Sequence, residues 1–256
     1  MFVIEHAVAH VLAGPSFAGY RIAAVGDFHI SPWRSTRAIE RAVATINAWQ
    51  PDIVMLVGDY GHSIRGLRPL ARRWYRSVIP RVVRVLTGLH ACDGIYAVLG
   101  NHDADGGSDA VAHALHAAGI TVLRNAAVDI RRGQAGIRVL GVEAMQEVPI
   151  SPKAMLGSEH DVAVIASHHP DFVTECRDHF GTTPLIVLAG HTHGGQVAFP
   201  LIGAPITLSR VATRRFPSGF VPNDVATLYV TRGLGEQLPV RLLAPREVTL
   251  LELAVR

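Results

Sequence analysis

Residues 184–193 read PLIVLAGHTH, and residues 194–196 continue with GGQ. A continuous apolar run of this length predicts a strand that is buried on both faces of a sheet. His191 and His193 follow the run directly, two residues apart. Residues at this spacing project to the same side of an extended chain, so we expect both imidazoles to face one site while Thr192 points away. Gly194 and Gly195 then allow a sharp turn and leave room for a ligand.

Other apolar runs end in the same way, at 20–29, 51–60, 94–103 and 161–170. Each is a short β-rich segment, and in each the apolar run gives way to Asp, Asn or His near its end. Helical patterns at 34–50 and 108–119 lie between some of these runs, and the alternation predicts right-handed crossovers and a largely parallel sheet. After residue 120 the pattern changes to strands and hairpin turns. We therefore expect an α/β fold of two sheets packed face to face with helices outside, in a single domain spanning residues 1–256.

The polar residues that end these runs form the candidate site. In open α/β sheets, ligands bind beyond the carboxyl ends of the strands, so these side chains are expected to converge on one edge. Their oxygen and imidazole nitrogen donors suit Mn, Fe, Zn, Co or Ni better than a structural zinc site made of cysteines. Seven donors exceed one tetrahedral site but fit two divalent metal ions that share a carboxylate. The predicted metal ligands are Asp27, His29, Asp59, Asn101, His168, His191 and His193.

Five blocks, in this order, carry a resemblance to a known family. They are DFH at 27–29, GD at 58–59, GNHD at 100–103, SH at 167–168 and GHTH at 190–193. Together they resemble the calcineurin-like metallophosphoesterases, and the stretches GHTHGGQ, SHHPDF and TRGLGEQLPVRLLAPREVTLLEL resemble the bacterial YkuE/YaeI-like phosphodiesterase branch. The resemblance implies a four-layer α/β/β/α sandwich, in which helices flank two mixed sheets.

The resemblance also implies a role for each residue. A water or hydroxide held by the metal ions would attack phosphorus, since metal binding can lower the pKa of water to about 7. His102 would be the catalytic residue near the leaving oxygen, where it donates a proton or stabilises charge. The first metal ion would be held by Asp27, His29 and His193. The second would be held by Asn101, His168 and His191. Asp59 would bridge the two ions.

Two positions leave alternatives open. Many relatives continue the second block as G-D-x-x-D, whose second Asp can support the catalytic histidine, whereas this chain reads GDYGH and has His62 there. Either another carboxylate supports His102 or the catalytic pair differs. In the stretch SHHP, the family pattern favours His168 over the neighbouring His169 as the ligand.

Residues 63–90 form a longer connection than this resemblance leads us to expect, and they suggest a helical cap or surface insertion. Arginines recur at helical spacing from Arg65 to Arg76, beside aromatic and aliphatic residues. One interpretation is an amphipathic helix that covers the sheet with a solvated basic face. The other is a basic, aromatic lid or membrane-surface helix that meets an anionic lipid or nucleotide substrate. Pro80 predicts a break or a kink in the helix, consistent with two short helices that form a cap.

Composition excludes several other classes of protein. Hydrophobic residues make up 49% of the chain and charged residues 18%, which is typical of a globular protein. The net charge of +3 comes without an RNA or DNA motif, so no specific nucleic-acid binding is expected. Residues 1–14 lack a basic leader and contain Glu5, His6 and His10, which favours an opening strand over a signal peptide. No transmembrane helix is predicted, and we expect a cytoplasmic protein with peripheral contact at the inner membrane surface through residues 63–90.

The predicted function is therefore hydrolysis of a phosphodiester or pyrophosphate-type bond by a binuclear metal-dependent phosphoesterase. The expected partner is a small-molecule or lipid-linked phosphoester substrate. One alternative is a lipid-linked UDP-diacylglucosamine-type pyrophosphate at a membrane surface, and another is a nucleotide phosphodiester. A third alternative is a non-catalytic scaffold of the same fold, which the presence of all eight site residues disfavours.

Overall fold

The structure, a computed structural model, describes eleven stretches of the chain: residues 2–11, 15–64, 67–143, 162–175, 183–199, 202–207, 209–213, 215–222, 224, 226–237 and 240–255. Arg65, the first arginine of the predicted basic pattern, lies outside these ranges.

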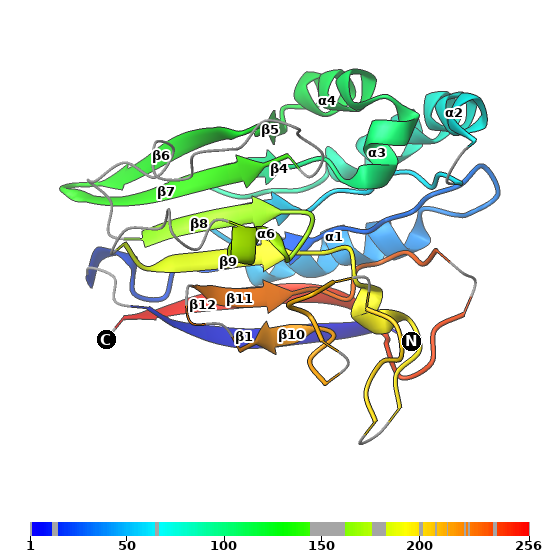
Figure 1. Cartoon of the computed structure of the whole chain (residues 1–256). Helices are drawn as coiled ribbons and strands as arrows, with labels where there is room; N and C mark the ends of the chain where they lie inside the picture. Colours follow the sequence, from blue (N-terminus) through cyan, green and yellow to red (C-terminus); the bar gives the residue numbers. More distant parts are fainter. Residues whose placement is uncertain are drawn as a thin grey trace.

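One six-stranded sheet has the order β1-β12-β2-β3-β4-β5 (Figure 1). Strands β2 to β5 are parallel, β12 is antiparallel to β2, and β1 is parallel to β12. The predicted opening strand is confirmed as β1. The bounds are β1 (Phe2–Val11), β12 (Arg246–Val255), β2 (Arg21–Val25), β3 (Ile53–Leu56), β4 (Ile95–Ala97) and β5 (Thr121–Val122).

The second six-stranded sheet has the order β10-β11-β9-β8-β7-β6. Its four inner strands are parallel, and both edge strands are antiparallel to their neighbours. The prediction of two mixed, largely parallel sheets is therefore confirmed. The bounds are β10 (Gly219–Val221), β11 (Thr227–Val230), β9 (Leu185–Ala189), β8 (Val162–Ser167), β7 (Ala135–Val142) and β6 (Ala126–Arg132).

The two sheets bury a common core. Strands β2, β3 and β4 contribute Ile22, Met55 and Tyr96, and these pack in one cluster with Val139 of β7 and Val164 of β8. Burying each such side chain contributes about 1.5–3 kcal/mol relative to leaving it in water. This interface fixes how the two sheets lie relative to each other, and with them the edge at which their strands end.

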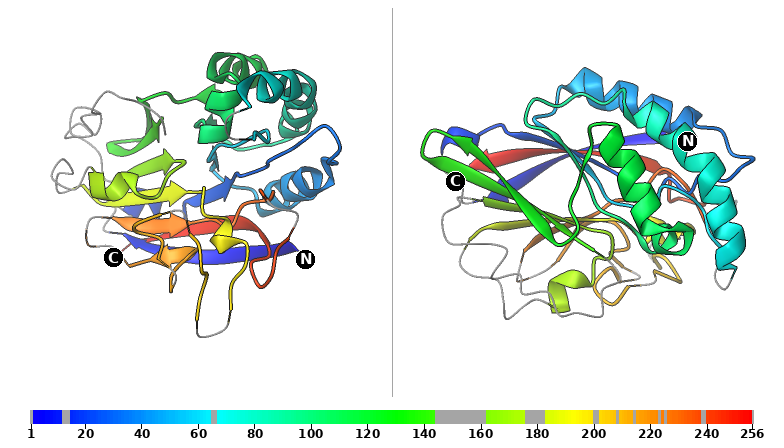
Figure 2. Two further views of the ribbon diagram at one scale, coloured as in Figure 1. Left: turned by 45° about the vertical axis from the view of Figure 1, so that its right-hand side comes forward. Right: turned by 90° about the horizontal axis from the view of Figure 1, so that it is seen from above.

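Helices complete the sandwich on its outer faces (Figure 2, right view). On one side, α1 (Arg37–Trp49), α2 (Arg68–Leu86) and α4 (Ser108–Ala117) pack on the first sheet through a second apolar cluster. On the other side, the short helix α6 (Phe172–Glu175) contributes Phe172 and Val173 to a third cluster on the second sheet. The layers follow the predicted four-layer α/β/β/α order. A further short helix, α3 (Asn101–Gly106), begins directly at the candidate site.

Helix α2 corrects the prediction of a break at Pro80. It is one helix that contains this proline. Proline removes the hydrogen bond to the Arg76 carbonyl, but Pro80 and Arg76 both lie on the exposed side of α2, where water can reach that carbonyl. The opposite side buries Tyr75, Val78 and Val82, so the amphipathic helix with an exposed basic face is the interpretation that the structure supports. In the described part of the chain, no helix has the length and apolar character needed to cross a membrane.

Candidate metal centre

All seven predicted ligands lie just after the carboxyl ends of five strands. Asp27 and His29 follow β2, Asp59 follows β3, and Asn101 follows β4 and opens α3. His168 follows β8 directly, and the remaining two histidines follow β9. Since β2, β3 and β4 belong to one sheet and β8 and β9 to the other, the candidate site joins both sheets at one end of the sandwich (Figure 1).

The backbone of these loops is left-handed at five of the seven positions. The φ angles are 49° at Asp27, 44° at His29, 57° at Asp59, 71° at His191 and 53° at His193. Residues other than glycine rarely adopt positive φ, and clusters of such residues are typical of functional sites. The strained positions therefore coincide with the residues that the sequence singled out.

This geometry corrects the expectation that His191 and His193 lie on an extended chain. Strand β9 ends at Ala189, and His193 already begins a short 3₁₀ turn. The two imidazoles reach the site because the backbone turns sharply, not because alternate side chains of a strand share a face. The Thr192 hydroxyl donates to the carbonyl of Pro217, 2.8 Å away, and so anchors the turn.

The two carboxylates occupy tight, glycine-lined positions. Both oxygens of Asp27 accept the backbone N–H of His191, at 3.1 and 3.0 Å. A Cβ atom on Gly190 would collide with the Asp27 carboxylate, and one on Gly100 would collide with the carboxylate of Asp59. Glycine at these two positions is what lets the loops approach the carboxylates so closely.

Asp59 lies at the centre of the cluster. One of its oxygens accepts the backbone N–H of His102 at 2.9 Å. The other oxygen lies 3.4 Å from Nε2 of His29 and 3.2 Å from Nε2 of His168. These two histidines belong to the two different ligand sets that the resemblance implies, and Asp59 lies between them.

Besides a group formed by His29, His62 and His102, three overlapping groups of side chains each have donor atoms close enough to hold one ion. The donor atoms in each group lie within 4.8 Å of one another. Asn101 joins the cluster through its side-chain oxygen, which lies 3.1 Å from Nε2 of His168. The groups are Asp27, His29 and His193; Asp27, Asp59 and His168; and His168, His169 and His191.

Unpaired buried atoms show that this cluster suits cations. Among the described residues, Nε2 of His29, Oδ2 of Asp59, Nδ1 of His191 and Nε2 of His193 are buried without a hydrogen-bond partner. Buried polar atoms are almost always paired, and leaving one unpaired costs about 1–3 kcal/mol. His168, in contrast, directs Nδ1 to the carbonyl of Val57 at 2.8 Å, which leaves Nε2 facing the cluster. Oxygen and imidazole donors of this kind fit divalent transition metals.

Burial also sets the protonation of the imidazoles. Burial lowers the pKa of His191 to about 2, with His168 adding to the effect, and it lowers the pKa of His193 to about 3, with Arg241 adding to the effect. The pKa of His29 is likewise held well below its usual value by burial. These three side chains are therefore neutral at pH 7, the form in which histidine binds metal ions.

His168 and Asp27 shift in the opposite direction. Burial alone would lower the pKa of His168, but the adjacent Asp59 carboxylate outweighs it and raises the pKa to about 10. Burial raises the pKa of Asp27 to about 7, and the nearby charge of Asp59 adds to the rise. Protons on Asp27 and His168 thus offset the negative charge around Asp59, which bound cations would otherwise offset.

Ser63 and Asp105 lie behind His102. Nδ1 of His102 accepts the backbone N–H of Ser63 at 3.0 Å and lies 2.7 Å from the Ser63 hydroxyl. That hydroxyl donates to Asp105 at 3.1 Å, and Arg68 donates to the same carboxylate at 3.2 Å. On the other side of the ring, the Gln237 amide lies 3.1 Å from Nε2.

Comparison with known proteins identifies the family to which this architecture belongs. The family model described as calcineurin-like phosphoesterase matches residues 20–195. The chain belongs to the calcineurin-like phosphoesterases. It is therefore a hydrolase that acts on phosphoester bonds, and the family is metal-dependent.

Three relatives align with this phosphoesterase over most of its length. The uncharacterized metallophosphoesterase YkuE of Bacillus subtilis is 30% identical, over 97% of this chain and 84% of that protein. Phosphodiesterase YaeI of Escherichia coli is also 30% identical, over 92% of this chain and 83% of that protein. UDP-2,3-diacylglucosamine pyrophosphatase LpxG of Chlamydia trachomatis is 23% identical, over 91% of this chain and 83% of that protein.

Several residues of the phosphoesterase site were not assigned a role from the sequence. Asp103 accepts backbone N–H groups from Asp59, Tyr60 and Gly100 at 2.8–3.0 Å, so it ties two of the ligand loops together. Its place in the GNHD block was the only signal of that role. The contacts that Ser63 and Gln237 make with His102 had no sequence signal, because they join segments that are distant in the chain.

The structure also brings two further histidines to the edge of the site. The ring of His169 lies 3.8 Å from that of His191, and its buried Nε2 has no partner. The ring of His62 stacks on those of His102 and Trp74, with interplanar angles of 22° and 20°. His62 therefore forms part of an aromatic wall beside the cluster, and the carboxylate near His102 is Asp105.

Proposed function

We propose that the chain hydrolyses a phosphodiester or pyrophosphate-type bond with two divalent metal ions bound around Asp59. The observation that carries this proposal is the set of buried, unpaired donor atoms around that carboxylate. When bound, such ions act as Lewis acids: they neutralise charge on the phosphoryl oxygens and lower the pKa of water. The proposed ligands of the first ion are Asp27, His29 and His193. Those of the second are Asn101, His168 and His191. Asp59 is the proposed bridge between the two.

His102 is proposed to donate a proton to the leaving oxygen. The backbone N–H of Ser63 points at Nδ1 in a direction fixed by the peptide plane, so Nδ1 must accept and Nε2 carries the proton of the neutral ring. The Nε2 proton faces Gln237 at the rim of the site, and a rotated Gln237 amide can accept it. A proton held there is available to a leaving group that occupies the same position.

Ser63 and Asp105 are proposed as positioning residues for His102. Since Nδ1 accepts, the Ser63 hydroxyl directs its single proton either to Nδ1 or to Asp105, and in both cases it lies between the ring and that carboxylate. Fixing the orientation and tautomer of a histidine is what the missing Asp of the second block would do in relatives. The Ser63–Asp105 pair supplies that constraint by another route.

Hydrolysis of bis-p-nitrophenyl phosphate with added Mn²⁺ tests the activity directly. We expect turnover that requires the metal and exceeds turnover of the monoester p-nitrophenyl phosphate. A protein that binds Mn²⁺ but cleaves neither compound would support a scaffold function and overturn this proposal.

A lipid-linked substrate is a second candidate, favoured by an apolar cavity beside the candidate metal centre. The cavity has a volume of about 220 Å³ and is lined by His193, Gln237, Ile206, Val240 and Pro205, among others. Ile206 is 67% exposed and Val240 is 54% exposed, so the wall of the cavity is apolar surface in contact with water. Such a wall suits an acyl chain next to the phosphate group.

Liposome flotation distinguishes this candidate from a water-soluble substrate. We expect binding to vesicles that contain an anionic lipid, with contact through the exposed basic residues of 63–90 and through the apolar cavity wall. Ile206→Ser should weaken that binding without loss of bis-p-nitrophenyl phosphate hydrolysis. Absence of binding to anionic and neutral vesicles alike would exclude the membrane surface and leave a soluble phosphodiester as the substrate.

A further inference from the structure

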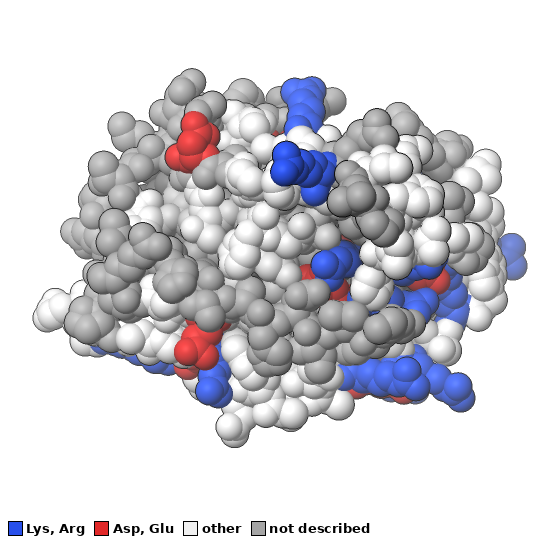
Figure 3. All heavy atoms as spheres, turned by 90° about the horizontal axis from the view of Figure 1, so that it is seen from below, with Lys and Arg blue, Asp and Glu red and all other residues white. Residues whose placement is uncertain are grey.

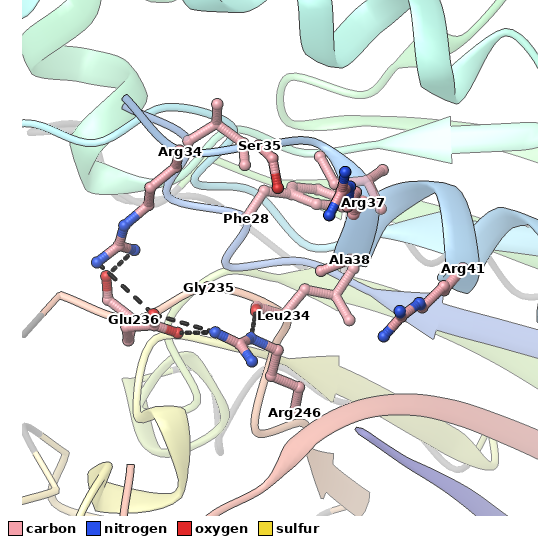
Figure 4. Close-up of a pocket in the computed structure, with 12 residues that line it drawn as sticks. Phe28, Arg34, Ser35, Arg37, Ala38, Arg41, Leu234, Gly235, Glu236 and Arg246 are labelled. Atoms are coloured by element: carbon pink, nitrogen blue, oxygen red, sulfur yellow. Dashed lines mark hydrogen bonds and ion pairs between the residues drawn. The ribbon is translucent and has the colours of Figure 1, made fainter. Parts of the chain in front are cut away.

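A second cavity lies beside the first sheet, behind the loop that carries Asp27 and His29. Its volume is about 320 Å³, and its lining includes Arg34, Arg37, Arg41, Arg246 and Glu236. None of the seven proposed metal ligands lines it. Figure 4 shows the four arginines around this space, which we name the arginine cavity.

The charges around the arginine cavity do not balance. Four guanidinium groups and one carboxylate line it, an excess of three positive charges, which equals the formal net charge of the whole chain. The positive charge of the molecule is thus strongly uneven. In the face that Figure 3 shows, arginine side chains lie at the right and lower right of the picture with some acidic side chains among them, and others lie at the top.

Glu236 cannot neutralise this set. It lies 3.7 Å from Arg34, 3.6 Å from Arg241 and 3.0 Å from Arg246, so three guanidinium groups share one carboxylate. These contacts hold Arg34 and Arg246 in place at the cavity wall.

Arg37 and Arg41 add charge without adding ion pairs. They lie one turn apart on α1, and within the described residues neither makes an ion pair or a side-chain hydrogen bond. The dashed lines of Figure 4 run from Arg34 and Arg246, and none runs from Arg37 or Arg41. The guanidinium groups of Arg37 and Arg41 are therefore available to a ligand, whereas those of Arg34 and Arg246 are held by Glu236.

We propose that the arginine cavity binds a small anion that carries at least two phosphate groups. The planar guanidinium group donates two parallel hydrogen bonds to a phosphate, which makes arginine the preferred side chain for this task. A single phosphate can engage only part of a set that lines about 320 Å³, whereas a diphosphate can reach both the fixed and the available arginines. This inference goes beyond the proposed hydrolysis and does not depend on it.

The cavity shares backbone with the loop that carries two proposed ligands. Phe28, between Asp27 and His29, lines the cavity, and so does Gly235, whose N–H donates to the Asp27 carbonyl. The anion would thus lie against the far side of the segment that holds part of the metal centre. Its binding is nevertheless separable, because the side chains involved are different.

Isothermal titration calorimetry with inorganic pyrophosphate, on the full chain with its metal ions bound, tests the proposal at about 0.15 M salt. We expect Arg37→Gln/Arg41→Gln to weaken one binding event at least tenfold while bis-p-nitrophenyl phosphate hydrolysis is retained. The matched control Arg72→Gln/Arg84→Gln removes the same charge from exposed positions of α2 and should leave binding unchanged.

The variant Asp59→Asn tests whether pyrophosphate binds at the arginine cavity or at the metal centre. We expect the arginine-dependent binding of pyrophosphate to persist in Asp59→Asn even though hydrolysis is lost. The proposal is overturned if Arg37→Gln/Arg41→Gln binds pyrophosphate as tightly as the unaltered chain, if both arginine pairs weaken binding equally, or if all binding disappears in Asp59→Asn. Failure of the chain to hydrolyse any phosphoester would leave this test unaffected.

Discussion

Both ends of the sandwich carry pairs of aspartates, but the two pairs differ in burial and in their ion-pair partners. At the carboxyl ends of the strands, Asp27 and Asp59 are fully buried, and Oδ2 of Asp59 has no hydrogen-bond partner. At the other end, Asp52 and Asp93 precede β3 and β4 and pair with Arg132 at 2.8 and 3.0 Å. Asp52, Cys92 and Asp93 also lie close enough together to hold an ion. The comparison teaches that proximity alone does not mark a metal site; only at the first end does it coincide with buried carboxylate and imidazole atoms that lack partners among the described residues.

The largest effect is expected from exchanging one carboxylate at each end. Asp59→Asn removes the charge between the two ligand sets, so we expect loss of bound metal and a fall in kcat of about 10³-fold or more. Asp52→Asn should change kcat less than twofold, because Arg132 retains Asp93. Metal content by mass spectrometry and hydrolysis of bis-p-nitrophenyl phosphate measure both. Equal losses of metal and of kcat in Asp59→Asn and Asp52→Asn would contradict the assignment of the metal centre to the end that carries Asp59.

His102→Ala separates metal binding from turnover at the end of the sandwich that carries the candidate metal centre. The side chain of His102 belongs to none of the proposed ligand sets, so metal content should stay unchanged while kcat falls about 10²–10⁴-fold. The loss should be greater for an alkyl phosphodiester than for bis-p-nitrophenyl phosphate, because a poor leaving group needs the proton more. Full activity of the variant would remove His102 from the mechanism.

Ser63→Ala should have a smaller effect, because the backbone N–H to Nδ1 of His102 remains. We expect a fall in kcat of about tenfold with little change in KM, and the same dependence on the leaving group as for His102→Ala. Ser63→Thr keeps the hydroxyl and should restore most of the rate. If Ser63→Ala and Ser63→Thr were equally impaired for every leaving group, the hydroxyl would have only a structural role.

The pH dependence of metal binding follows from the raised pKa values at this end. Asp27, with its pKa raised to about 7, and His168, with its pKa raised to about 10, must lose protons to bind cations. Affinity for Mn²⁺ should therefore rise with pH between 6 and 8, by up to about tenfold per pH unit for each proton released. Calorimetry in buffers of different ionisation enthalpy counts the protons. An affinity that is constant over this range would contradict the assignment.

The smallest effect is expected at the opposite end. The side chain of Arg132 is 39% exposed, so its ion pairs with Asp52 and Asp93 are screened by solvent. Arg132→Ala should lower the free energy of unfolding by no more than about 1 kcal/mol, a part of which reflects loss of its contact with the Tyr20 ring. Thermal unfolding measures this, and hydrolysis should be unchanged. A large loss of activity would mean that the two ends are coupled.

Much of the fold was predictable because buried strands leave a simple pattern. Continuous apolar runs identified β2, β3, β4, β8 and β9, and the polar residues after each run marked the shared edge. The conformation of that edge was not predictable from the same pattern. His191 and His193 read as a continuation of a strand, yet both have positive φ, because the site and not the local sequence dictates the backbone there.

Contacts between distant loops account for the rest of what the sequence did not predict. Ser63 lies 39 residues from His102, and Gln237 lies 135 residues from it, so no spacing rule joins them. Pro80 predicted a break in a helix that the structure shows to be continuous, because burial of Tyr75, Val78 and Val82 favours the helix and the proline is exposed. Tertiary packing decided each of these features.

The most direct test of the central claim is anomalous X-ray diffraction from crystals of the protein grown with Mn²⁺. The account predicts two peaks roughly 3.5–4 Å apart, with the Asp59 carboxylate between them and no peak at Asp52 and Asp93. A single peak remote from Asp59, or a peak only at the opposite end of the sandwich, would contradict it.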